Sequence, residues 1–195
     1  QLKKYYGVTK NDKILQIIDK LDQIIIDKSY IVLNEAENNP HNNSRYYDVI
    51  NGLTGTVMYL MLDKENPKKS TLIKRILTMF VEKSHLLLMN NLLTSEFYID
   101  VQNCELESGY HNYISESYLD IGMAHGVAGP LYALSYCYQK GICVKNQVKA
   151  IKKLSYLYKY YYKNNSTFSH WITRIDLSNN VLCSPNEINH PRPSW

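Results

Sequence analysis

His125 is the residue of this chain whose surroundings best suit chemistry. It lies in the stretch IGMAHGVAGP at residues 121–130, among small residues and glycines, and a long apolar run follows. Small neighbours leave an imidazole open to a substrate, and glycine lets the backbone turn sharply into a helix. Because histidine exchanges a proton near neutral pH, we expect His125 to be a reactive side chain at the N-terminal end of a buried helix.

An earlier glycine pair repeats this arrangement. The pattern NGLTG at residues 51–55 precedes one apolar helix, and HGVAG at residues 125–129 precedes another, with the same offset at both glycines. Asn51 occupies the position of His125 in the first copy, and we expect it to fix a helix start without doing chemistry. Each copy then combines one buried helix with one amphipathic helix.

Hydrophobic periodicity predicts five helices along the chain. The first covers about Asn11 to Glu35, the second is the apolar run Thr56 to Leu62, and Pro67 suits the first turn of the third. The last two are expected from about Val127 to Gln139 and from about Asn146 to Tyr162. The apolar stripe of the first helix consists of Ile14, Ile17, Ile18, Leu21 and Ile25.

The remaining segments lack helical periodicity. Residues 94–118 are expected to form a long loop, and residues 168–176 to form a short strand or extended segment. Repeated helical hairpins bury their faces by stacking on neighbours, and alternating buried and half-exposed helices indicate an inner and an outer layer. We therefore predict an all-α, two-layer α/α toroid in one domain over residues 1–195. Two repeats do not close a ring, so we expect an incomplete part of it.

Composition narrows the function classes. The net charge is +4 and the arginines are four isolated residues rather than a dense basic stripe, so we expect no nucleic-acid partner. The four cysteines form no Cys-x-x-Cys pair, which is typical of reduced thiols in a cytosolic protein. The sequence contains neither a signal peptide nor a bilayer-length apolar run, and we expect a cytoplasmic location.

Three segments resemble the signatures of the lanthipeptide (lantibiotic) cyclases, the LanC-like family. They are YDVINGLTG at residues 47–55, GMAHGVAG at residues 122–129 and RPSW at residues 192–195, in the family order. The resemblance implies a partial LanC-like domain over residues 1–195, with the active site in the central mouth of a toroid. It also implies thioether ring closure, in which a peptide cysteine adds to dehydroalanine or dehydrobutyrine.

The resemblance implies roles for three residues. His125 would act as general acid or base, taking the thiol proton or protonating the carbon of the enolate. Asp48 would hold the tautomer of this imidazole, although its sequence position also suits an N-cap of the following helix. Arg192 would stabilise the developing enolate or orient Asp48.

The family's zinc ion binds and activates the peptide thiolate. Its ligands are the cysteine of a Trp-Cys-Tyr-Gly motif and a later Cys-His pair, and this sequence ends at Trp195. We therefore expect zinc in the complete family member and no zinc ligand in this chain. The expected partners are a dehydrated precursor peptide, and a dehydratase and a transporter in a membrane-associated complex, with the protein peripheral to the membrane.

Two other functions remain open from the sequence. One is a non-catalytic LanC-like fragment that binds precursor peptide or acts as a scaffold, which the missing zinc ligands favour. The other is an unrelated α/α-barrel glycan hydrolase, which needs two carboxylates across the barrel mouth. This alternative ranks last, because the sequence pairs Asp48 with a histidine instead.

Overall fold

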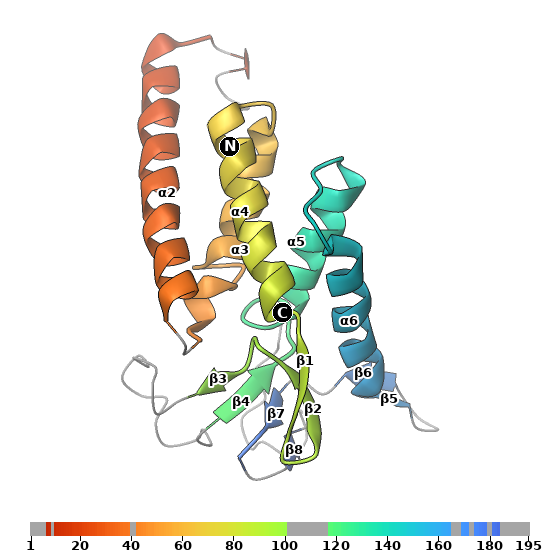
Figure 1. Cartoon of the computed structure of the whole chain (residues 1–195). Helices are drawn as coiled ribbons and strands as arrows, with labels where there is room; N and C mark the ends of the chain where they lie inside the picture. The colour runs from red at the N-terminus through yellow and green to blue at the C-terminus, as the bar shows by residue number, and fades with distance from the viewer. Residues whose placement is uncertain are drawn as a thin grey trace.

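The structure is a computed structural model that describes residues 7–8, 10–39, 42–100, 117–164, 169–171, 174–178 and 181–183. Five long helices dominate it, and Figure 1 shows them side by side above a group of short strands. They are α2 (Asp12–Asn38), α3 (Leu53–Leu60), α4 (Pro67–Lys83), α5 (Ala128–Gln139) and α6 (Gln147–Tyr160). Short 3-10 turns, η1 (Ser44–Tyr46) and η2 (Met61–Asp63), join them.

The helices form the two layers that the sequence predicts. Helices α3 and α5, which follow the two glycine pairs, pack against each other, and α4 contacts α2, α3, α5 and α6. The core between them is apolar and includes the fully buried residues Leu33, Leu53, Leu72, Phe80, Leu134 and Leu154. This mostly helical arrangement is consistent with part of an α/α toroid.

Local signals set the helix ends. The side chain of Asn11 accepts the Lys13 N–H at 3.0 Å before α2, and that of Asn66 accepts the Lys68 N–H at 3.0 Å before α4. Pro67 occupies the first turn of α4, as predicted. Gly141, with φ of +82°, lies just beyond the end of α5 and adopts a conformation that glycine tolerates.

The predicted helical fold class is confirmed, and the structure adds short antiparallel strands to the helices. The bounds are β1 (Leu86–Met89), β2 (Leu92–Ser95), β3 (Ile99–Asp100), β4 (Ser117–Asp120), β5 (Tyr162–Asn164), β6 (Ser169–Trp171), β7 (Arg174–Asp176) and β8 (Val181–Cys183). The sheet orders are β1-β2, β3-β4-β7-β8 and β5-β6. Strands β6 and β7 confirm the extended segment predicted at residues 168–176.

Strands β2, β3 and β4 lie partly or wholly in the predicted loop at residues 94–118, of which residues 101–116 lie outside the described part. Strands of two to four residues are too short for a period-2 pattern to stand out. The turn between β1 and β2 did carry a signal: Asn90 and Asn91 both have positive φ, 49° and 65°. Two-residue hairpin turns of this kind favour asparagine.

The prediction of which residues form the apolar stripe of α2 was partly wrong. Ile17 and Leu21 are 48% and 40% exposed, whereas Ile18 is buried. The inward face instead consists of Ile18, Asp22, Ile26, Ser29, Leu33 and Ala36. A hydrophobic pattern assigns polar residues to the outside, but Asp22 lies inside because it has a charged partner there.

That partner is Lys69, a buried cation on α4 that is only 2% exposed. Its Nζ forms an ion pair with the carboxylate of Asp22 and lies 2.8 Å from Oδ2 of Asp63. The hydroxyl of Tyr59 donates to Oδ1 of Asp22 at 2.5 Å, and burial, together with this carboxylate, raises the pKa of Tyr59 to about 12. This charged cluster links α2, α3, η2 and α4.

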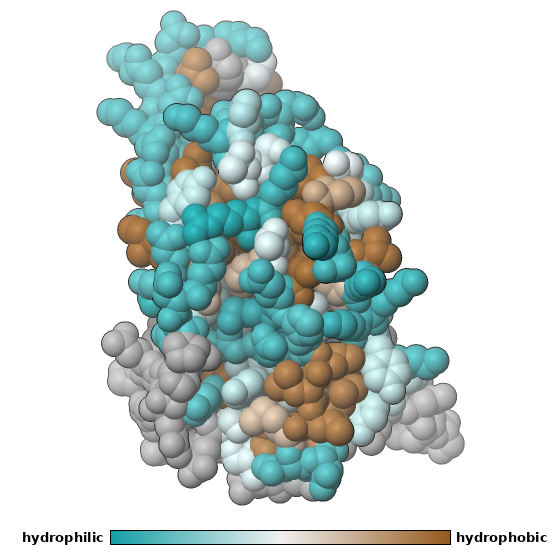
Figure 2. Space-filling model, in the orientation of Figure 1, coloured by the Kyte–Doolittle hydropathy of each residue, from teal (hydrophilic) through white to brown (hydrophobic). Residues whose placement is uncertain are grey.

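Figure 2 shows that this face of the protein is largely hydrophilic, with an apolar patch low on it over the β1–β2 hairpin. Leu88, at the exposed side of β1, is 71% exposed. Among the described residues, no helix combines the length and the apolar character needed to cross a membrane.

Candidate active site

The structure brings His125 and Asp48 together although they lie 77 residues apart in the sequence. Nδ1 of the imidazole contacts Oδ2 of Asp48 in a hydrogen bond. A carboxylate can only accept, so Nδ1 carries the proton and donates it. The Asp48 side chain is 5% exposed and that of His125 is 57% exposed. A buried carboxylate therefore holds an imidazole that solvent can reach.

Backbone groups hold Asp48 in place. Its Oδ1 accepts the N–H of Ile50 at 2.5 Å and the N–H of Asn51 at 2.8 Å, which leaves Oδ2 for His125. The alternative that Asp48 caps the next helix is wrong in its detail: the cap of α3 is Gly52, which makes no side-chain hydrogen bond. Asp48 stabilises the turn before α3, and this role is compatible with its bond to His125.

Asn51 does not act as predicted through its side chain. The first residue of α3 is Leu53, its cap is Gly52, and the contribution of Asn51 is the backbone N–H that it donates to Asp48. The prediction that Asn51 fixes the start of the helix is therefore not confirmed, because its N–H belongs to the turn that precedes the cap.

Two glycines allow the segments on either side of this pair to turn tightly. A Cβ on Gly55 would lie 2.1 Å from the carbonyl oxygen of Val49, and one on Gly126 would lie 2.5 Å from the carbonyl oxygen of Asp120. The N–H of Val49 donates to the carbonyl of Ala124 at 2.9 Å, which ties the Asp48 turn to the His125 loop. Glycine at these two positions is thus required by close backbone approach within each segment.

Two further polar residues that the sequence analysis missed support the His125 loop. Asp120, at the end of β4, accepts the N–H of Gly122 at its Oδ1 (2.7 Å) and the N–H of Val127 at its carbonyl (3.0 Å). Nη2 of Arg174 lies 3.6 Å from the other carboxylate oxygen of Asp120. Burial raises the pKa of the Asp120 carboxyl, while the Arg174 charge opposes this shift. An Asp-x-Gly turn before a loop was the available sequence signal.

Comparison with known proteins identifies the family. The family model described as lanthionine synthetase C-like protein matches residues 5–195. The chain belongs to the lanthionine synthetase C-like family. It is 31% identical over 155 residues to the nisin biosynthesis protein NisC of Lactococcus lactis subsp. lactis, covering 76% of this chain and 34% of NisC.

A solved structure of a nisin cyclase is similar as well. It superposes with a TM-score of 0.63 at 27% identity, and the match covers 80% of this chain and 37% of that cyclase. This lanthionine synthetase C-like chain therefore spans about a third of the length of the relatives it matches. The family resemblance and the partial toroid expected from the sequence are confirmed.

The third predicted site residue of this family member, Arg192, lies outside the described residues, and its role stays a prediction.

The described part of the chain has no set of residues that fits zinc. In it, no three histidine, cysteine or acidic side chains lie close enough together to hold a metal ion. Zinc would supply thiolate activation where its ligands are present.

The two cysteines whose side chains the structure describes differ sharply in exposure. Cys137 on α5 is buried and Cys143 is exposed. Burial raises the pKa of the Cys137 thiol to about 11. Because the thiolate is the reactive form, the buried Cys137 is suited neither to bind a metal nor to attack a substrate at neutral pH.

We expect iodoacetamide at pH 8 to alkylate Cys143 in the native protein while Cys137 stays unmodified. At that pH only about one Cys137 thiol in a thousand is ionised, given its pKa and the tenfold change per pH unit. Peptide mapping by mass spectrometry measures both sites, and labelling in denaturant provides the control in which both react. Equal labelling rates at the two sites in the native protein would contradict the burial of Cys137.

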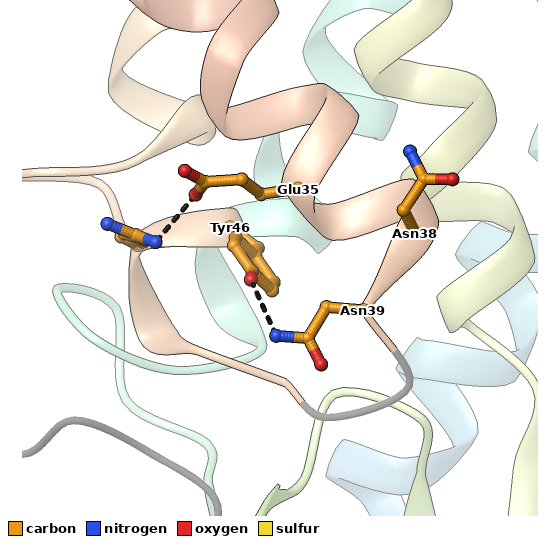
Figure 3. Close-up of a pocket in the computed structure, with 5 residues that line it drawn as sticks. Glu35, Asn38, Asn39 and Tyr46 are labelled. Atoms are coloured by element: carbon orange, nitrogen blue, oxygen red, sulfur yellow. Dashed lines mark hydrogen bonds and ion pairs between the residues drawn. The ribbon is translucent and has the colours of Figure 1, made fainter.

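A cavity of about 320 Å³ lies elsewhere, at the C-terminal end of α2. Figure 3 shows four of its lining residues, Glu35, Asn38, Asn39 and Tyr46. Arg45 donates to Glu35 at 2.5 Å, and the Asn39 amide donates to the Tyr46 hydroxyl at 3.5 Å. Neither His125 nor Asp48 lines it. Asn38 donates to the carbonyl of Asn34, so these polar groups have partners within the fold and we assign the cavity no chemistry.

Proposed function

We propose that this protein is a lanthionine-forming cyclase, which adds cysteine thiols of a dehydrated precursor peptide to dehydroalanine or dehydrobutyrine. The observation that carries the proposal is the bond from an exposed imidazole, His125, to the buried carboxylate of Asp48. Membership of the family of NisC and the nisin cyclase supports it.

The reaction needs two proton transfers and no net change of atoms. The cysteine sulfur loses its proton and bonds to the β carbon of the dehydro residue, while the double-bond electrons move toward the α carbon and its carbonyl. The resulting enolate then accepts a proton at the α carbon. One group that accepts a proton and returns one serves both steps.

His125 is suited to this work because its two ring nitrogens have different tasks. Nδ1–H donates to Asp48, and this bond fixes the tautomer in which Nε2 carries the lone pair. Nε2 would accept the thiol proton, and the protonated ring would then supply a proton to the α carbon. The two backbone N–H bonds to Asp48 keep the carboxylate, and hence the ring, in one orientation.

Arg192 completes the proposal as the cation that stabilises the negative charge of the enolate. The cytoplasmic location and the dehydratase and transporter partners stay predictions. Zinc, which the complete family member is expected to hold, also stays a prediction for this protein.

Ring closure is measured by thiol counting on the precursor peptide. The native protein is incubated with a dehydrated peptide that contains cysteines, the product is treated with N-ethylmaleimide, and its mass is determined. We expect each ring to remove one alkylation site while leaving the peptide mass itself unchanged. A peptide that binds but keeps all its thiols would overturn the proposal and favour the non-catalytic, peptide-binding alternative.

A further inference from the structure

We propose that Asp120 and Arg174 are a positioning pair for His125, holding the loop of residues 121–127 so that the imidazole meets Asp48. This inference rests on the proposed function, because it assigns the two residues a part in the same reaction. Neither residue belongs to the sequence motifs from which His125 and Asp48 were predicted.

The first support is the way in which Asp120 closes the loop at both ends. Its side chain accepts the N–H of Gly122 at the beginning, and its backbone carbonyl accepts the N–H of Val127 at the end. Gly126, the residue after His125, packs so closely that an added Cβ would lie 2.5 Å from both of these Asp120 oxygens. The residue therefore fixes both flanks of the histidine.

The second support is the way in which Arg174 holds Asp120. The two residues lie opposite each other in the antiparallel pairing of β4 and β7. The guanidinium also lies over the ring of Tyr118, 4.5 Å from its centroid, which restricts its position. Arg174 approaches Oδ2 of Asp120, and Oδ1 stays oriented toward the loop.

A third contact comes from the helical layer. The hydroxyl of Tyr158 on α6 donates to the carbonyl of Ile121, the first residue of the loop. The sheet and the helices thus converge on the segment between Asp120 and His125. Burial raises the pKa of the Asp120 carboxyl, and the neighbouring cation of Arg174 opposes this shift.

Asp120→Asn tests the pair, because it keeps an oxygen for the Gly122 N–H but presents no negative charge to Arg174. Asp176→Asn is a matched control: its carboxylate accepts the N–H of Ser178, two residues on, at 2.9 Å, but this turn does not lead to His125. The ¹⁵N signals of the His125 ring report the tautomer directly. They are assigned as the signals that disappear in the His125→Asn variant. Kinetics of ring closure report kcat and KM separately.

We expect the wild-type and Asp176→Asn spectra to show the Nδ1–H tautomer, and Asp120→Asn to show a mixture of both tautomers. Ring closure by Asp120→Asn should lose up to about 100-fold in kcat with little change in KM, the scale of an ångström-sized misplacement. Arg174→Gln should act in the same direction, and adding it to Asp120→Asn should cost little more, because the two residues act as one unit.

The proposal would be overturned if Asp120→Asn showed the same ¹⁵N shifts of His125 and the same kcat as the wild-type protein. If Asp120→Asn does not fold, Arg174→Gln decides the question. The Arg174 side chain is 32% exposed, and its replacement keeps the hydrogen bonds that Asp120 accepts from the loop. The spectra also separate the two proposals. If the native protein closes no rings, the cyclase proposal fails, while the tautomer measurement still decides whether Asp120 and Arg174 position His125.

Discussion

The His125→Asn variant is expected to close thioether rings about 10²- to 10⁴-fold more slowly than the native protein, the usual contribution of a positioned acid–base group. Asparagine can still donate a hydrogen bond toward Asp48 from its amide. It has no nitrogen that takes up and returns a proton near neutral pH. The loss should therefore appear in kcat, with the affinity for the dehydrated peptide kept. Thiol counting over time measures the rate.

His85→Asn is the matched control for this prediction. His85 is an exposed histidine whose Nδ1 lies 3.2 Å from Nζ of Lys153, and it has no part in the proposed site. We expect it to retain the native rate. If His125→Asn closed rings as fast as His85→Asn does, proton transfer by His125 would be excluded.

Lys69→Met is expected to lower the free energy of unfolding by about 3–5 kcal/mol, the cost of removing one partner from a buried ion pair. Methionine has nearly the same length as the lysine stem. It leaves the Asp22 carboxylate, buried between α2, α3 and α4, without its cation. Asp63 loses the same partner. Urea unfolding followed by circular dichroism measures the change.

Lys68→Met, at the exposed neighbouring position of α4, is the control and should change the free energy of unfolding by at most about 0.5 kcal/mol. Removing the orphaned charge as well, in Lys69→Met with Asp22→Leu, should recover part of the loss. A Lys69→Met protein as stable as the Lys68→Met protein would show that the buried cluster does not stabilise the helices.

The sequence predicted the features that depend on long or strongly constrained patterns. The five helices and the first-turn position of Pro67 follow from periodicity and from the chemistry of proline. The pairing of His125 with Asp48 was implied by the family resemblance. Gly129, in the second glycine repeat, allows the two motifs to approach each other, because an added Cβ would lie 2.8 Å from Cγ2 of Val49.

The features that the sequence did not predict depend on contacts between distant segments. Asp22 faces inward because it pairs with Lys69. That residue lies 47 positions further along the chain, so no local sequence pattern indicates the pair. The role of Asp120 depends on Arg174 in another strand of the same sheet. The strands themselves are short, and pairing rather than local periodicity defines them.

The measurement that tests the central claim most directly is ring closure in D₂O, followed by hydrolysis and chiral analysis of the lanthionine residues. If the His125–Asp48 pair delivers the proton to the α carbon, the native protein should give one deuterium per ring in a single configuration at that carbon. His125→Asn should give little product, with both configurations present. Equal rates and the same single configuration from both proteins would contradict the account.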